Sequence, residues 1–200
     1  MKARRSALLS STMLLAMTFA PAVTAATWEI DPVHSTAQFK VKHMMITNVT
    51  GDFGKVTGTI NYDPADLAKS SAEATIDATT IDTRNPDRDN HLKSPDFFDV
   101  EKFPTITFKS KKFEKTGDGK LKVTGDLTMR GVTKEVVLDV DGPLPEIKDP
   151  RGNAKSGATA TTKLNRQEFG VSWSKTLDGG GLVVSDEIFV TIEMEIKKKV

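Results

Sequence analysis

Three stretches of the chain alternate between apolar side chains and largely polar ones. They run over 37–43, 121–130 and 188–197, and their apolar positions recur at every second residue. Period-two alternation is typical of β-strands that bury one face and expose the other to water. Strands of this kind occur mainly in antiparallel sheets, so the chain is predicted to be all-β and antiparallel.

Five weaker segments share the alternation and bring the expected number of strands to about eight. They cover 53–62, 71–79, 104–113, 133–141 and 155–165. A very short glycine-containing turn separates the strands over 121–129 and 133–140, which predicts a hairpin. Eight half-exposed strands leave open edges unless the sheet closes, so an eight-stranded antiparallel β-barrel with an interior cavity is favoured. A two-sheet sandwich with a dry core is the alternative.

Two segments interrupt the strand pattern. Asn85 followed by Pro86 is a helix-start signal, and the short helix is expected to end near Ser94-Pro95, between the third and fourth strands. The segment 142–157 holds three prolines and several charges, which predicts a long surface loop.

The first 25 residues are predicted to be a cleaved secretory signal peptide, leaving a single barrel domain over 26–200. Lys2, Arg4 and Arg5 precede a short apolar run, and Val23-Thr24-Ala25 places small residues before a cleavage site. The expected location is the periplasm. Cleavage would remove three positive charges from a chain whose formal net charge is +1.

Composition excludes several classes of function. The chain has no cysteine, which excludes disulfides, cysteine-ligated metal and thiol catalysis. No basic cluster with interleaved aromatic residues suggests nucleic-acid binding. No second apolar run suggests a membrane span.

The histidines give little indication of a metal centre or a catalytic site. His34, His43 and His91 are the only histidines, and no two have the local spacing of zinc ligands. The charged segment around Arg88 and Asp89 offers no evident nucleophile, and no hydrolase, phosphate-binding or dinucleotide-binding motif occurs. We therefore expect neither a metal nor catalysis, although a histidine acting as a base on a lipid substrate remains an alternative.

Apolar residues of one parity are predicted to face the interior, where they either line a cavity or fill a core. Phe97 and Phe98 follow the predicted helix and are expected to cover an apolar opening. His43 shares the inward parity of its strand. The candidate wall residues from the strands are Phe39, Val41, Val56, Ile60, Ile76, Ile106, Phe108, Leu127, Met129, Ile188, Val190 and Ile192.

Four stretches, in the same order and at compatible spacing, resemble the YceI family. They are "TWEIDPVHSTAQFKVKHMMITNVTGDFGKVTGTI", "IDTRNPDRDNHLKSPDFFDVEKFPTITFKS", "GKLKVTGDLTMRGVTKEVVLDV" and "LNRQEFGVSW". The resemblance runs from Trp28 to near the C-terminus. It implies a lipocalin-like barrel, exported to the periplasm and often dimeric, that binds a long apolar molecule such as a polyisoprenoid or a fatty-acid-derived lipid.

The resemblance also adds candidate site residues. Phe169 and Trp173 join the predicted apolar wall, and no cofactor other than the bound lipid is implied. A polar head group would meet basic side chains at the mouth of the barrel. The alternative is that the charged residues near the helix only hold it to the barrel, and a stress-related interaction protein with a filled barrel also remains open. The head-group candidates are His34, His43, Arg84, Arg88, His91 and Arg166.

Overall fold

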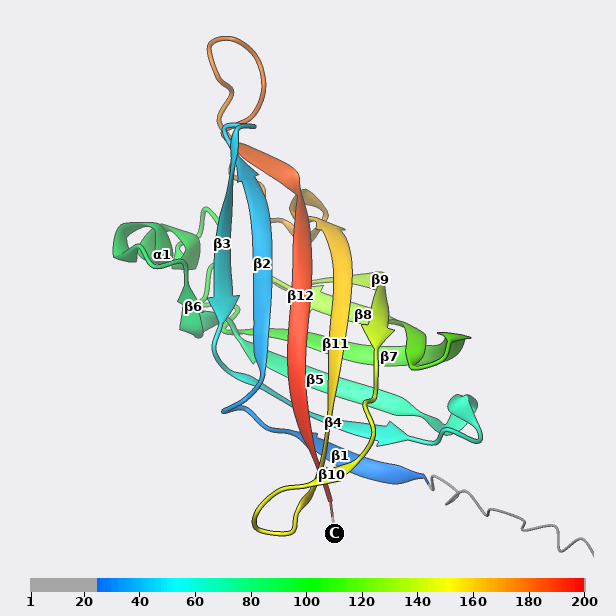
Figure 1. Ribbon diagram of the computed structural model, residues 1–200. Coiled ribbons are helices and arrows are strands. Elements are labelled where there is room, and N and C mark those ends of the chain that lie inside the picture. Colours follow the sequence, from blue (N-terminus) through cyan, green and yellow to red (C-terminus); the bar gives the residue numbers. More distant parts are fainter. Residues whose placement is uncertain (1–24, 200) are drawn as a thin grey trace, which may run out of the picture.

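The computed structural model describes residues 25–199, and most of these residues lie in strands (Figure 1). The predicted signal peptide lies outside the described residues except for Ala25. One short helix, α1 (Pro86–Lys93), interrupts the strands. The strands are β1 (Ala26–Ile30), β2 (Thr36–His43), β3 (Thr47–Phe53), β4 (Val56–Tyr62), β5 (Ser71–Asp77), β6 (Ile81–Asp82), β7 (Thr105–Gly117), β8 (Lys120–Met129), β9 (Val132–Asp141), β10 (Ile147–Lys148), β11 (Ala154–Asn165) and β12 (Val184–Lys198).

Eight of these strands form a closed ring. The hydrogen-bonded order is β1, β4, β5, β7, β8, β9, β11 and β12, and β12 pairs back with β1. Every pairing in the ring is antiparallel. The predicted eight-stranded antiparallel barrel is therefore confirmed, and closure removes the open edges that a flat sheet would leave.

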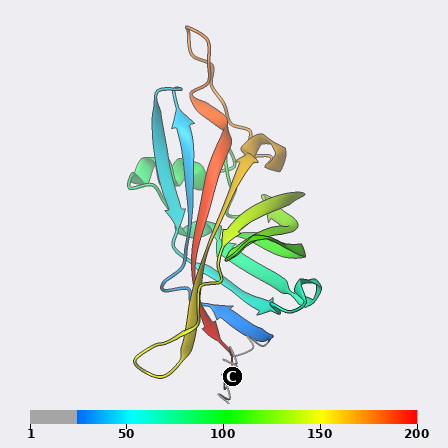
Figure 2. The same cartoon turned by 45° about the vertical axis from the view of Figure 1, so that its right-hand side comes forward.

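The membership of the ring differs from the prediction at its first strand. The short strand β1 belongs to the ring, whereas the predicted strand over 37–43 is β2, which branches from it. Strand β12 pairs with β1 through Ile196–Lys198 and with β2 through Val184–Glu193. Turned by 45°, the barrel shows β2 and β3 standing beside β12 and β11, opposite the wall formed by β4, β5, β7, β8 and β9 (Figure 2).

The turns and the helix follow the local sequence closely. Arg130 and Gly131 both have positive φ, at 50° and 74°, and they join β8 to β9 as the predicted hairpin. The Asn85 side chain accepts a hydrogen bond from the main-chain N–H of Arg88, and Pro86 opens α1. The helix start, its end at Lys93 and its place between the third and fourth predicted strands are confirmed.

The segment 142–157 is more ordered than the predicted surface loop. Its middle forms β10, which pairs with the first residues of β11. The Asp149 carboxylate accepts main-chain hydrogen bonds from Arg151 and Asn153, which fixes a tight turn between the two strands. The prediction of a long surface loop was wrong for residues 147–148 and 154, which are in strands, whereas residues 155–157 belong to β11 as the predicted strand over 155–165 implies.

The inward-facing side chains fall into two groups with different exposure. Trp28, Val56 and Ile196 are among those that are almost completely buried. Phe39, Ile60 and others on neighbouring strands also face inward and pack against this core, yet they remain partly exposed. Inward-facing apolar residues that keep exposed surface indicate an interior that their side chains do not fill.

Candidate functional site

A cavity of about 210 Å³ lies inside the barrel. All eight strands of the ring contribute to its wall, together with β2, β3, α1 and the segment that follows α1. The wall is apolar, which suits an apolar ligand and disfavours water or ions. The question that alternation alone leaves open, a filled or a hollow barrel, is therefore answered in favour of a hollow one.

The structure places all but two of the predicted wall residues on the cavity. The two exceptions are Phe169 and Trp173. Phe169 is only 1% exposed and belongs to the core outside the wall, while the ring of Trp173 packs against α1. The predicted residues that do line the cavity are Phe39, Val41, Val56, Ile60, Ile76, Phe97, Phe98, Ile106, Phe108, Leu127, Met129, Ile188, Val190 and Ile192.

Further wall residues were missed by the sequence reasoning. Trp28 and Ile30 line the cavity from β1, which was not recognised as a strand. Leu121 and Val123 lie on a strand whose alternation was recognised, so inward parity would have identified them. Tyr62 could have been found in the same way, because it lies two residues beyond Ile60 on β4.

Phe97 and Phe98 close the wall beneath α1. Phe98 packs edge-on against Phe53 with ring centroids 5.6 Å apart, and Phe53 in turn contacts Phe39 at 5.9 Å. Edge-to-face packing of this kind is favourable and fixes the rings in place. Both phenylalanines line the cavity, and their expected role as a cover over an apolar opening stays a prediction.

Arg88 and Asp89 fasten α1 to the strand before it. The Arg88 guanidinium donates from Nε to Thr83 Oγ1 and from Nη2 to the Thr83 carbonyl, each at 2.7 Å. The Asp89 carboxylate accepts from the main-chain N–H of Thr83 at 2.8 Å and from its hydroxyl. Thr83 is only 4% exposed. This arrangement favours the structural role over contact with a head group.

His91 lies outside the cavity in an aromatic cluster with Phe97 and Trp173. Its ring meets both neighbours edge-on, with centroids 5.0 Å and 5.4 Å apart, and its Nε2 lies 2.9 Å from the Asp96 carboxylate. The contacts hold the end of α1 against the segment that carries Trp173. Like Arg88, His91 therefore has partners within the protein.

Arg84 and His43 do not line the cavity either. Arg84 has a left-handed backbone, with φ at 63°, and lines a second pocket to which Phe189 and Lys163 also contribute. His43 ends β2, where it pairs with Val184. Neither position brings the basic side chain to the interior wall.

Arg166 is the one predicted head-group residue that reaches the cavity wall. It is 3% exposed, and each of its five N–H groups has an acceptor within the chain. The acceptors are the carbonyls of Val171, Trp173, Val184 and Ser185 and the carboxylate of Asp186. Burial lowers the pKa of Arg166, but a guanidinium remains charged in proteins. The geometry leaves it no free donor for a ligand.

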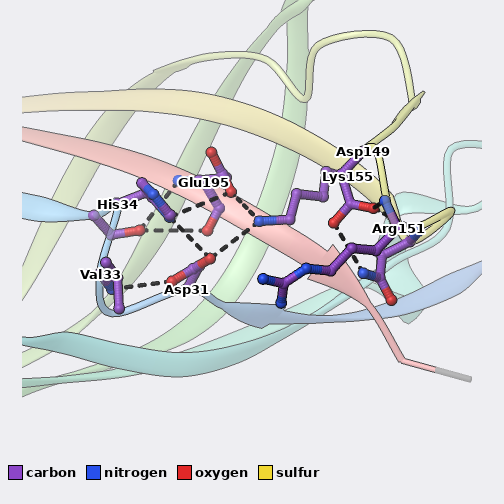
Figure 3. Close-up of polar contacts among 9 residues, drawn as sticks. Asp31, Val33, His34, Asp149, Arg151, Lys155 and Glu195 are labelled. Carbon is purple, nitrogen blue, oxygen red and sulfur yellow. Dashed lines mark hydrogen bonds and ion pairs between the residues drawn. The ribbon is translucent and has the colours of Figure 1, made fainter.

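His34 belongs to an ion cluster at the end of the barrel where β1 meets β12 (Figure 3). Its Nδ1 lies 3.1 Å from the Asp31 carboxylate and 3.6 Å from that of Glu195. The Lys155 ammonium lies between the same two carboxylates, 3.1 Å from Asp31 Oδ2 and in direct contact with Glu195 Oε1. The cluster ties the β1–β2 connection to β11 and β12.

The donor set of Asp31, His34 and Glu195 has the spacing of a cation site, with ligand atoms within 4.8 Å of one another. Lys155 already supplies the positive charge there. The hydrogen bond with His34 and the bond from the Val33 main-chain N–H hold the pKa of the Asp31 carboxyl well below its usual range, and Lys155 lowers it further. The arrangement is therefore better explained as a salt-bridged connection between strands.

Asp31 should make folding stability depend on acid. A carboxyl whose pKa is lowered by folding stabilises the protein above its unfolded value of about 4, and this contribution is lost as the pH falls below that value. We expect urea unfolding to show a steeper stability loss between about pH 5 and about pH 2 for the wild type than for Asp31→Asn. Asp178→Asn, in an exposed loop, is the control and should keep the wild-type slope. Equal slopes for all three proteins would contradict the role of Asp31.

Within residues 25–199, no helix has the length and apolar character needed to cross a bilayer.

The family model and the related sequences indicate the same family. A model of the YceI-like domain matches residues 28–196. A UPF0312 protein of Vibrio cholerae is 38% identical over 152 residues, which cover 75% of this chain and 80% of that protein.

Solved structures share the fold. The crystal structure of the Campylobacter jejuni YceI protein has a TM-score of 0.66 at 37% identity, covering 80% of this chain and 91% of that one. A polyisoprenoid-binding domain from Saccharophagus degradans, at 11% identity, has a TM-score of 0.62 and covers 87% of this chain and 99% of that one. The family model spans most of the chain and includes the barrel and its cavity, so this protein belongs to the YceI family.

Proposed function

We propose that this protein binds a long-chain apolar amphiphile, such as a polyisoprenoid or a fatty-acid-derived lipid, inside the barrel and carries or sequesters it without chemical change. The observation that carries the proposal is the hollow interior with an apolar wall. Because the wall is mostly apolar, it offers a ligand mainly the burial of apolar surface. Binding would thus depend on the hydrophobic effect.

The extent of the wall suits a long, thin ligand. On β12 alone the wall residues extend from Val184 to Ile196, roughly 40 Å of strand at 3.3 Å per residue. Each Å² of apolar surface that a ligand removes from water contributes about 25 cal/mol. A long alkyl or isoprenoid chain would therefore bind without a covalent step, even after the costs of ordering it.

The likeness to the polyisoprenoid-binding domain of Saccharophagus degradans supports the same ligand class through the shared barrel. The proposal includes that the protein does not catalyse a reaction of the bound lipid. His34, His43 and His91, the residues that could act as bases, all lie outside the cavity wall. Arg166, which reaches the wall, has every donor engaged.

The cellular setting in this proposal is the periplasm, after removal of the signal peptide predicted over 1–25. A homodimer is compatible with the proposal and is not required by it, because the cavity is enclosed by strands of a single chain.

The test is to identify what the protein carries. The protein is purified from its own host, extracted with organic solvent, and analysed by mass spectrometry beside a non-lipid-binding exported protein purified in the same way. We expect a long-chain lipid in stoichiometric amount in this protein and not in the control. Recovery of no lipid, together with no binding of palmitate or a polyprenyl phosphate by calorimetry, would overturn the proposal.

A further inference from the structure

One polar group on the cavity wall has no partner within the described chain. Tyr62 is the only tyrosine in the sequence, and its ring lies on the wall where β4 ends. Within residues 25–199 its hydroxyl makes no side-chain hydrogen bond, whereas two other polar wall residues, Thr162 and Arg166, are engaged. The hydroxyl of Thr162 donates to the carbonyl of Val137, and Arg166 is saturated. Tyr62, partly buried at the end of β4, thus carries a hydrogen-bond donor without a partner in the described residues.

The register of β7 places a lysine at the same end of the cavity. Phe113, a wall residue, is paired with Val123, and Lys115 is paired with the wall residue Leu121. Since side chains alternate along a strand, Lys115 belongs to the same inward parity as Phe113 and lies one step closer to the rim. At this rim the apolar wall ends at Tyr62, and Lys115 lies beyond it with a side chain that is 63% exposed.

The strand between Tyr62 and Phe113 carries small inward-facing side chains at this end. Strand β5 lies between β4 and β7, and Ala72 and Ala74 are its wall residues of inward parity here, on either side of Glu73. Two alanines leave space between the larger side chains of Tyr62 and Phe113. The opposite end differs, because there Arg166 and Val171 are buried and closely bonded.

The charges at this end suit an anion. Lys115 is paired at 3.0 Å only with Asp118, whose side chain is completely exposed, so the pair is weak and easily exchanged for another anion. Burial raises the pKa of Tyr62, opposed by the charge of Lys115. The hydroxyl therefore stays protonated at neutral pH and can donate to an oxyanion.

We propose that this end is the mouth of the cavity and that Tyr62 and Lys115 bind the anionic head group, a carboxylate or a phosphate, of an amphiphile whose tail fills the barrel. The inference rests on the proposed function and adds the chemistry of the head. It locates the head group away from Arg88 and His91, whose partners lie in and around α1, and away from Arg84.

The test measures head-group preference at constant tail. Binding of hexadecanol, palmitate and hexadecyl phosphate is compared by calorimetry with the delipidated wild type, Tyr62→Phe and Lys115→Gln. Lys112→Gln is the matched control, because Lys112 lies on the same strand with nearly equal exposure, 62% against 63%, and forms an ion pair with Glu114 on the outer face. Each preference is the Kd of the alcohol divided by the Kd of the anionic ligand.

We expect the wild type and Lys112→Gln to prefer the anionic ligands by about tenfold or more, and Tyr62→Phe and Lys115→Gln to lose most of that preference while still binding hexadecanol. A larger preference for palmitate would indicate a fatty-acid type of ligand, and a larger preference for hexadecyl phosphate would indicate an isoprenoid-phosphate type. Equal binding of alcohol and anions by the wild type, or an unchanged preference in both variants, would overturn the head-group site alone. Failure of all three ligands to bind the wild type would overturn the proposed function itself.

Discussion

Replacing Arg166 by leucine is expected to lower the free energy of unfolding by about 4 kcal/mol. The guanidinium is 3% exposed and satisfies four main-chain carbonyls, from Val171, Trp173, Val184 and Ser185, besides the Asp186 carboxylate. Leucine can replace the packing but none of the hydrogen bonds, so several carbonyls would be left without donors. The measurement is urea unfolding followed by tryptophan fluorescence near neutral pH.

Arg151→Leu is the control for this experiment. Arg151 lies in the exposed turn between β10 and β11, where only its main-chain N–H is engaged, by Asp149. Its replacement should leave the unfolding midpoint unchanged. A loss for Arg166→Leu no larger than that of the control would show that the buried guanidinium is not needed to connect the segment after β11 to β12.

Replacing Val190 by tryptophan is expected to abolish binding of long-chain ligands while the barrel still folds. Val190 lies midway along β12, lines the cavity and pairs with Phe39 and Thr162 on the neighbouring strands. An indole at this position would occupy much of a space of about 210 Å³. Overpacking costs about 1–3 kcal/mol in a filled core, and less where space is available.

The readouts are palmitate binding by calorimetry and the amount of lipid recovered on extraction. Thr191→Trp is the matched control, since it adds the same side chain one residue further along β12, on the outer face, and should bind like the wild type. Normal ligand binding by Val190→Trp would mean that the ligand does not occupy the interior of the barrel.

Most strands were predictable, because a strand that buries only one face alternates between apolar and polar residues. Four strands were not predicted as such, and two of them, β6 and β10, have only two residues each. β1 has only five residues, too few for alternation to stand out. β3, with the sequence TNVTGDF, is mostly polar because much of it lies on the branch outside the ring.

The apolar wall was predictable from parity, but its hollowness was not. The same inward set of side chains fills a narrow barrel and lines a wide one, and the difference depends on strand stagger and tilt, which single residues do not encode. The basic residues around α1 were attractive as head-group ligands because they cluster in sequence. In the structure, Arg88 donates hydrogen bonds to Thr83, and Arg166 donates to main-chain carbonyls. The sequence does not show which carbonyls lack a partner, because that depends on the path of the backbone.

The long last strand has a consequence for the order of folding. β12 is shared by three neighbours, and its pairing with β1 joins residues near the two ends of the described chain, Trp28 with Lys198. Contacts this distant in sequence form late, because a large loop must close before they contribute. Until β12 docks, the edges of β1 and β11 stay unpaired and the interior is an open trough. An apolar chain therefore has two routes inward: sideways during folding, or end-on through the mouth once the ring has closed.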